Sequence, residues 1–370
     1  MVAHRLQLVL CAGSAALSLA VLGEVGVRFL AQRDQDHNCY FRGYHLKPYR
    51  LPRTKIAKFA KKLEKGKTDV VADSDLGWAP RPQFQSDLAI QDRYGLRATS
   101  TQRAVDPVPG EASYRIALFG DSFTYGAEVA YEDSWCGYLE RQFALPGLQT
   151  EVLNFGVSGY GMDQAYLRWK HQGAKFKPQL VVFGLQFENV KRNTNLVRAI
   201  YNPRTGLPFS KPRFVLEEDR LRLVNHPCVS PQELSDVLED FENWQWSPHE
   251  AHYRAQDYQA SWWHASRLLT FVQTVIGEVW LAEQSDYRPN SEEARLGLKI
   301  IENFADSVES ADAQFVVLVM PKRKDLEYAM IYGEFPYEAV LAAAGRPLSL
   351  VRADLQLLRA AKADTLESLY

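Results

Sequence analysis

The sequence predicts an α/β domain in which a short parallel sheet is covered by helices on both faces. Three observations indicate this class. Apolar runs of strand length alternate with amphipathic helical segments along the chain. The runs read as buried strands, and turns rich in glycine or polar residues follow their ends. We take the elements in order.

The first element is the apolar run 114–119, which reads as a buried strand and leads directly into Gly120-Asp121-Ser122-Phe123. A helix-like stretch from Ser134 to Phe143 follows. A serine at the point where a core strand breaks into a helix is well placed to act as a nucleophile, because the strand end fixes the hydroxyl. Gly120 allows a sharp turn, and a helix N-terminus favours a developing oxyanion. Ser122 is the candidate catalytic residue, although Gly-Asp-Ser is also ordinary turn chemistry.

Two further strand ends carry groups that acyl transfer needs. The run 151–155 ends in the glycine-rich turn 156–161, which contains Gly159, and a helical pattern follows from Asp163 to Gln172. The run 179–187 is followed by Asn189. Parallel strands end at one edge of a sheet, where ligands of open α/β sheets bind. A hydroxyl, a glycine and an amide at that edge supply an attacking oxygen and N–H donors for a tetrahedral oxyanion.

With these three blocks, the chain resembles the SGNH or GDSL family of ester and acyl hydrolases. The resemblance implies that Ser122 is the nucleophile, that Gly159 gives a backbone oxyanion donor and that Asn189 gives a side-chain donor. The third block of the family is usually Gly-x-Asn-Asp, whereas this chain has Glu188-Asn189-Val190, so Asn193 is the alternative to Asn189. The resemblance extends from about residue 75, where Asp75-Leu76-Gly77-Trp78 is similar to the lead-in of anchored bacterial members.

The resemblance implies a flavodoxin-like three-layer α/β/α sandwich and hydrolysis through an acyl-enzyme, with no metal or organic cofactor. The substrate is expected to be an O-acyl ester, with an acetylated surface glycan as one candidate. Two alternatives stay open: an O-acyltransferase that uses the same serine, and a non-catalytic glycan-binding or scaffold protein.

The general base is the main departure from the family, which takes it from an Asp-x-x-His block near the C-terminus. The sequence has no histidine after His264. Either the chain is a fragment, or the protein lacks the base, or an internal histidine substitutes. The internal candidates are poor. His171 is late on its helix, and the 249–252 pair does not have zinc-protease spacing and is expected to be a solvated patch. His264 is expected to pack or cap, and Asp34-Gln35-Asp36-His37 is far from the strand ends. We therefore expect little turnover from the chain as given.

Composition limits the class of protein. The chain has 370 residues, 46% hydrophobic and 24% charged, which suits one large α/β domain with attachments. The net charge of −2 argues against nucleic acid as the main partner. The four cysteines, at positions 11, 39, 136 and 228, form neither a disulfide framework nor a metal-site spacing.

An uncharged segment from Leu6 to Gly23 predicts an N-terminal transmembrane helix, since it would span roughly 27 Å as a helix. A cleaved signal peptide is the alternative. The flanking charges do not settle the orientation. The resemblance to anchored members implies a single-pass protein of the bacterial inner membrane with an extracytoplasmic domain.

The expected organisation is an anchor at 1–31, a juxtamembrane spacer and lead-in at 32–112, and the hydrolase domain at 113–370, incomplete at its C-terminus. Within the spacer, 55–67 predicts a basic amphipathic helix. The domain carries an insertion at about 193–291, referred to below as the insertion. Residues 213–224 predict a hairpin with an acidic turn, and the rest is aromatic and helical. Its four tryptophans are expected mostly to be buried.

Overall fold

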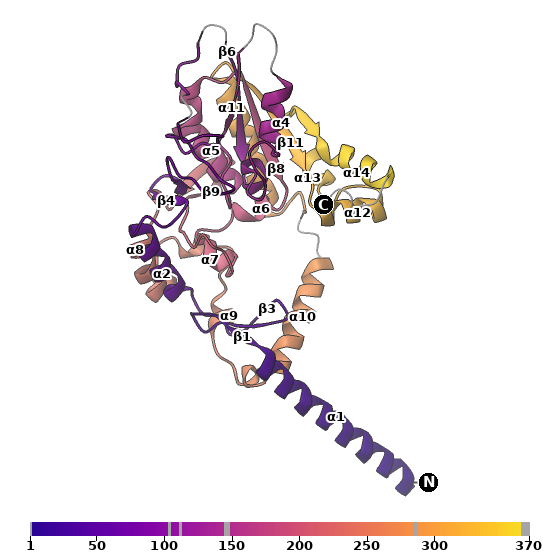
Figure 1. Ribbon diagram of the computed structural model, residues 1–370. Helices are drawn as coiled ribbons and strands as arrows, with labels where there is room; N and C mark the ends of the chain where they lie inside the picture. Colours follow the sequence, from indigo (N-terminus) through magenta and orange to yellow (C-terminus); the bar gives the residue numbers. More distant parts are fainter. Residues whose placement is uncertain (1, 103–104, 111–112, 144–148, 284–286, 364–370) are drawn as a thin grey trace.

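The centre of the computed structural model is a five-stranded parallel sheet (Figure 1). The structure describes residues 2–102, 105–110, 113–143, 149–283 and 287–363. All neighbouring strands of this sheet pair in parallel. Across the sheet the order is β12 (Leu350–Arg352), β11 (Gln314–Met320), β8 (Leu180–Gln186), β6 (Ser113–Gly120) and β7 (Gln149–Asn154). The predicted α/β fold class is confirmed.

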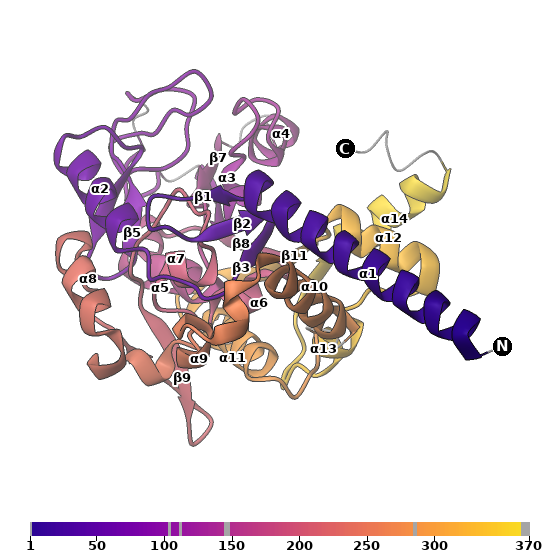
Figure 2. The same cartoon turned by 90° about the horizontal axis from the view of Figure 1, so that it is seen from below.

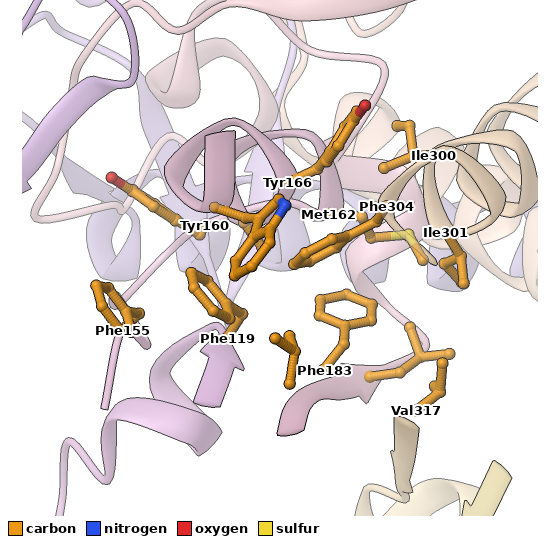
Figure 3. Packing of buried hydrophobic residues seen from close by; sticks show 14 of the residues in the cluster. Phe119, Phe155, Tyr160, Met162, Tyr166, Phe183, Ile300, Ile301, Phe304 and Val317 are labelled. Carbon is orange, nitrogen blue, oxygen red and sulfur yellow. The ribbon is translucent and has the colours of Figure 1, made fainter. Parts of the chain in front are cut away.

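One face of the sheet packs against helices α5 (Met162–His171) and α11 (Glu292–Glu309). Side chains alternate along each strand, so every second residue points to this face. Phe119 of β6 and Phe183 of β8 are opposite each other in the ladder, and both contact Phe304 of α11. Figure 3 shows these rings interdigitating with the side chains of α5. This core fixes the strand ends from which the candidate site is built.

The opposite face is covered by α4 (Trp135–Gln142), which begins after its N-cap Ser134, as the sequence predicts. Ile116 and Leu118 of β6 form a second apolar cluster with Cys136 of α4. The β11 side of the sheet is packed by α14 (Ala353–Ala363), which in turn contacts α12 (Arg323–Tyr332). The short α13 (Glu338–Ala342) lies beside α11. Helices therefore flank the sheet on both sides (Figure 1).

The residues before β6 form several small elements. A three-stranded antiparallel sheet consists of β1 (Gln32–Arg33), β2 (Cys39–Phe41) and β3 (Tyr44–Leu46). The predicted basic helix is α2 (Arg53–Glu64), which packs against the insertion through the buried Ile56. A two-stranded ladder of β4 (Val70–Asp73) and β5 (Gly77–Pro80) presents Trp78 to the main core.

The insertion leaves the sheet after β8 and returns at α11. The predicted hairpin is present as β9 (Arg213–Glu217) and β10 (Arg220–Val224). The rest consists of short helices and one long helix, α10. In chain order the helices from β8 onward are α6 (Asn189–Arg192), α7 (Arg198–Tyr201), α8 (Pro231–Val237), α9 (Ala255–Tyr258) and α10 (Arg267–Glu283). Four short 3-10 helices complete the described helices of the chain, at Gly173–Phe176, Leu238–Asn243, Ser247–His249 and Trp262–Ala265.

The N-terminal helix α1 (Val2–Leu30) projects from the rest of the molecule, with the N-terminus at its far end (Figures 1 and 2). By length and composition, its part Gly13–Leu30 could cross a membrane. Little of that part is covered by the protein, since only 6% is buried. A signal sequence would pass the same test.

A buried glutamate joins two segments of the insertion. Glu250 accepts hydrogen bonds from the backbone N–H groups of Leu196, Val197 and His252, at 2.6, 2.8 and 3.1 Å. Desolvation nevertheless raises the pKa of Glu250 from 4.5 to about 7, against the lowering effect of these donors. The folded protein therefore holds this proton more tightly than the unfolded chain does.

The raised pKa of Glu250 predicts a pH dependence of stability. Its contribution is fully present below pH 4.5 and is lost as the pH rises through about 7, amounting to roughly 3 kcal/mol. Between pH 5 and pH 7.5, we expect the melting temperature of Glu250→Gln to rise relative to that of wild type. Glu218→Gln, at the exposed tip of the β9–β10 hairpin, should track wild type. An unchanged difference for Glu250→Gln would contradict the prediction.

Candidate functional site

The turn after β6 holds Ser122 at the start of a single helical turn, α3 (Ser122–Tyr125). Gly120 has φ +153°, and a Cβ there would lie 2.2 Å from Thr124 Oγ1, so only glycine fits this sharp turn. Asp121 caps the helical turn, because its Oδ1 accepts a hydrogen bond of 2.9 Å from the Phe123 N–H. Ser122 is partly exposed and faces a small cavity of about 230 Å³. The cavity is also lined by Phe123, Gly126, Ala127, Glu128 and Val129.

The turn after β7 carries Gly159, with φ +85°. The following carbonyl, of Tyr160, accepts a hydrogen bond of 2.9 Å from Arg192 Nη1. Trp78 of the lead-in lies beneath the turn and donates to the Ser158 carbonyl at 3.2 Å. The left-handed backbone at Gly159 is therefore held in place from both sides.

Asn189 is the first residue of α6, just beyond the end of β8. Its Nδ2 donates to Asp121 Oδ2 at 3.0 Å, and Arg192 Nη1 donates to the same oxygen at 3.2 Å. Asn189 Oδ1 is buried without a partner among the described residues. Because Arg192 also binds the Tyr160 carbonyl, these contacts join the three predicted turns. In this state the amide of Asn189 is bound to the residue before the serine.

Asn193, the alternative to Asn189, has a structural position instead. Its Oδ1 accepts hydrogen bonds from the backbone N–H groups of Met162, at 3.0 Å, and Asp163, at 3.4 Å. Its Nδ2 contacts Met162 Sδ at 3.0 Å. These bonds satisfy donors in the first turn of α5, which would otherwise lack partners. Of the two asparagines, the structure places Asn189 beside the serine turn.

The basic side chains that surround these turns were not identified from the sequence. Arg198 of α7 is only 6% exposed, and its Nε and Nη1 have no partner in the described part of the chain. Its Nε lies 3.7 Å from where a Cβ on Gly159 would be. Burial, together with the charge of Arg192, lowers the pKa of Arg198 to about 10. Burial also lowers the pKa of Lys322, which pairs with Glu188.

The histidines considered as substitutes for the base are engaged elsewhere. His171 is exposed beside Asp75, as expected. His264 Nδ1 accepts a hydrogen bond of 3.0 Å from the Ser261 N–H, which caps a short helix. The expectation of a solvated patch at 249–252 is wrong for His252, whose ring packs near Thr194 and the Lys191 carbonyl. Burial lowers the pKa of His252 to about 4, which keeps it neutral. Tyr370, where the sequence ends, lies outside the described residues.

One group of potential metal ligands lies on the surface, away from the serine turn. The ligand atoms of Asp75, His171 and His226 are all within 4.8 Å of one another. His226 Nε2 is 3.0 Å from one oxygen of Asp75, and His171 Nδ1 is 3.7 Å from the other. Since the side chains are 33–42% exposed, these contacts are surface ion pairs when the histidines are protonated.

The three turns lie in a segment that matches a known protein family. Residues 118–202, which contain all three turns, match the model of the GDSL-like lipase/acylhydrolase family. This segment of the chain is similar to that family. The matched residues run from β6 through α7, and so include the serine turn and both arginines.

The chain is also similar to solved structures of esterases. AlinE4, an esterase of the SGNH-hydrolase family, has 16% identity over 71% of this chain and 99% of that chain, with a TM-score of 0.21. A catalytic mutant of Axe2, an acetylxylan esterase from Geobacillus stearothermophilus, has 12% identity over 67% of this chain and 91% of that chain, with a TM-score of 0.25. Likenesses at this level carry no information on substrate. No curated protein matches the chain.

Proposed function

We propose that the protein is a serine hydrolase that cleaves an O-acyl ester through an acyl-enzyme on Ser122. The observation that carries this proposal is the arrangement at the serine turn. Ser122 faces a cavity at the end of strand β6, and Asn189 and Arg192 bind the adjacent Asp121. This edge of a parallel sheet is where ligands of α/β domains bind.

The reaction needs the serine oxygen and donors for the charge that develops. Ser122 Oγ bonds to the ester carbonyl carbon while its proton passes to a base. The oxyanion receives hydrogen bonds from the N–H groups of Ser122 and Gly159 and from the Asn189 amide. Collapse breaks the bond to the alcohol oxygen, which leaves with the proton, and water then releases the acid by the same steps. Losing one donor costs about 10²- to 10³-fold in rate.

Two features of the site limit turnover. Asn189 Nδ2 is bound to Asp121, so it must change partner to reach the oxyanion. The one Asp-x-x-His of the sequence, Asp34–His37, precedes the sheet, and no such block follows β8 to deprotonate the serine. A serine hydroxyl without a base is a poor nucleophile near neutral pH. We therefore expect residues 1–370 by themselves to react slowly.

The charge around the turns favours an ester whose remaining part is negatively charged. Arg198 is buried next to Gly159 and stacks over the Tyr201 ring, but its Nε and Nη1 have no hydrogen-bond partner among the described residues. Leaving the donors of a buried charge unpaired is costly. Among the described residues, the Asp121 carboxylate pairs with Arg192, and its charge also acts on Arg198. An acetylated acidic glycan would supply a carboxylate for this position. If a sugar hydroxyl took the place of water, the same serine would catalyse acyl transfer. Product analysis with and without a sugar acceptor distinguishes acyl transfer from hydrolysis.

We further propose that α1 is a membrane anchor and that the hydrolase acts outside the cytoplasm of a bacterial cell. The support is the apolar part Gly13–Leu30, which is little covered by the protein. Such an anchor would hold the enzyme close to glycans of the cell surface.

A fluorophosphonate probe tests the nucleophile. We expect slow labelling of the full chain in detergent, accelerated by added imidazole as a substitute base and mapped to Ser122 by mass spectrometry. Ser122→Ala should abolish the labelling, and Ser158→Ala, in the neighbouring turn, should keep it. As a competition arm, an acetylated uronic-acid glycan should slow labelling more than an acetylated neutral glycan, and Arg198→Met should remove that difference. Labelling that persists in Ser122→Ala, or that imidazole never produces in wild type, would refute the proposal.

A further inference from the structure

Helix α10 begins beside the C-terminal part of α1, although the two are more than 200 residues apart in sequence (Figures 1 and 2). The Glu24 carboxylate of α1 accepts hydrogen bonds from Ser266 Oγ, Arg267 N–H and Leu268 N–H, at 2.8, 3.0 and 2.9 Å. Glu24 therefore caps the N-terminus of α10. The Leu268 side chain packs against Gly23. These contacts fix the start of α10 against the candidate membrane span.

One face of α10 is attached to the body of the protein. Phe271 packs edge-on against Phe41 and Tyr44 of the small sheet, with ring centroids 4.8 and 5.6 Å apart. Thr270 and Thr274 help to line a cavity of about 320 Å³ between α10 and residues 251–257 of the insertion. The side of α10 that turns toward this cavity is thus mainly polar.

The face of α10 that points outward is apolar. Leu269, Val272 and Ile276 are 50, 43 and 62% exposed. Spacings of three and four residues put them on one side of a helix. A surface helix of a soluble protein has the opposite arrangement, with its apolar stripe toward the core. Just before α10, the Trp262 side chain is 82% exposed.

We propose that this outward face of α10, together with Trp262, lies in the interface of the lipid bilayer that α1 spans. The inference rests on the proposed anchor. The apolar side chains of α1 are exposed up to Phe29 and Leu30, so a bilayer around α1 reaches the level at which α10 begins. A helix with an apolar face and neighbouring tryptophan is typical of the headgroup boundary.

The charges near the start of α10 agree with this placement. Arg28 donates to the Ala265 carbonyl at 2.5 Å, and Arg267 donates to the Lys47 carbonyl at 3.2 Å. Lys47 pairs with Asp257 at 2.6 Å, and Arg28 pairs with Glu24. Arg267 has no carboxylate partner among the described residues, so it is the cation here that can attract anionic headgroups. Of the possible occupants of this face, the bilayer is the one already positioned beside it by α1.

Environment-sensitive probes at three positions test the inference in the full chain. Single cysteines at Val21, Val272 and Thr274, in a background without the native cysteines, would carry a nitrobenzoxadiazole group. The protein would be reconstituted in phosphatidylethanolamine/phosphatidylglycerol vesicles containing brominated acyl chains. We expect blue-shifted emission and strong quenching at 21 and 272. Position 274 is the matched control, because Val272 and Thr274 have nearly the same shape and lie on opposite sides of α10.

The three positions separate the possible failures. Quenching at 21 with none at 272 would leave the anchor standing and overturn the inference about α10. Equal quenching at 272 and 274 would also overturn it, because no outward face would then be selected. Absence of quenching at 21 would refute the anchor and the inference together. Unchanged melting temperatures for the three labelled variants confirm that the fold is kept.

Discussion

Lys211→Met should destabilise the protein by about 3–5 kcal/mol, the cost of leaving a buried charge without its partner. Lys211 forms an ion pair with Asp163, and the two side chains are 1% and 0% exposed. Burial lowers the pKa of Lys211, while Asp163 raises it. The lysine also donates to the Pro212 carbonyl at 3.0 Å. Urea unfolding followed by tryptophan fluorescence measures the effect.

Two variants make the test of Lys211 specific. Lys299→Met breaks the surface pair with Asp219, whose side chain is 76% exposed, and should cost less than about 1 kcal/mol. The double variant Lys211→Met with Asp163→Asn should recover much of the loss, since no unpaired charge remains. If Lys211→Met costs no more than Lys299→Met, the buried pair does not have the stabilising role described.

Gly156→Ala should cost about 3 kcal/mol, at the upper end of the usual range for overpacking. A Cβ at Gly156 would lie 2.5 Å from the Tyr125 backbone nitrogen and 2.8 Å from the Thr124 carbonyl carbon. Both atoms are backbone of α3, so relief requires moving the turn that begins at Ser122. Fluorophosphonate labelling of Ser122 should fall together with the free energy of unfolding.

Gly110→Ala is the control for Gly156→Ala, because a Cβ at Gly110 would meet nothing within 4 Å. It should change stability by no more than about 0.5 kcal/mol and leave labelling unchanged. Equal stability of the Gly156→Ala and Gly110→Ala variants would contradict the close packing of α3 against the end of β7.

Local pattern was enough to predict the strands and the three turns. Apolar runs of strand length separated by glycine and polar residues specify β6, β7 and β8 directly, and Ser134 marks the start of α4. These signals lie within about ten residues, so no tertiary contact is needed to read them. The same holds for the β9–β10 hairpin, whose acidic turn separates two apolar runs.

The partners of the site residues depend on contacts that the sequence does not display. Asn189 and Asn193 are one turn apart, and only packing shows that Asn193 binds α5 while Asn189 binds Asp121. Arg192 follows Asn189 closely and could have been considered from its position alone. Arg198 carries no such signal, because its place beside Gly159 results from the path of the insertion.

The expectation that most tryptophans of the insertion are buried was wrong for Trp262 and Trp263, which are 82 and 38% exposed. Trp244 and Trp246 are partly buried and pack against the apolar cluster around Phe241. Aromatic content predicts core packing when a segment folds over the sheet. Here the segment around Trp262 runs instead toward α1, as the bonds from residues 266–268 to Glu24 show.

The hydrogen bonds that Glu24 accepts also restrict how the enzyme can reach its substrates. A domain joined to its anchor by a flexible linker could reach many heights above the lipid. Here α1 is fixed to the start of α10 by the hydrogen bonds of Glu24 and Arg28. With α1 in a bilayer, Ser122 would stay at a nearly constant distance from the membrane surface. Acyl groups at other distances would have to move to the proposed hydrolase.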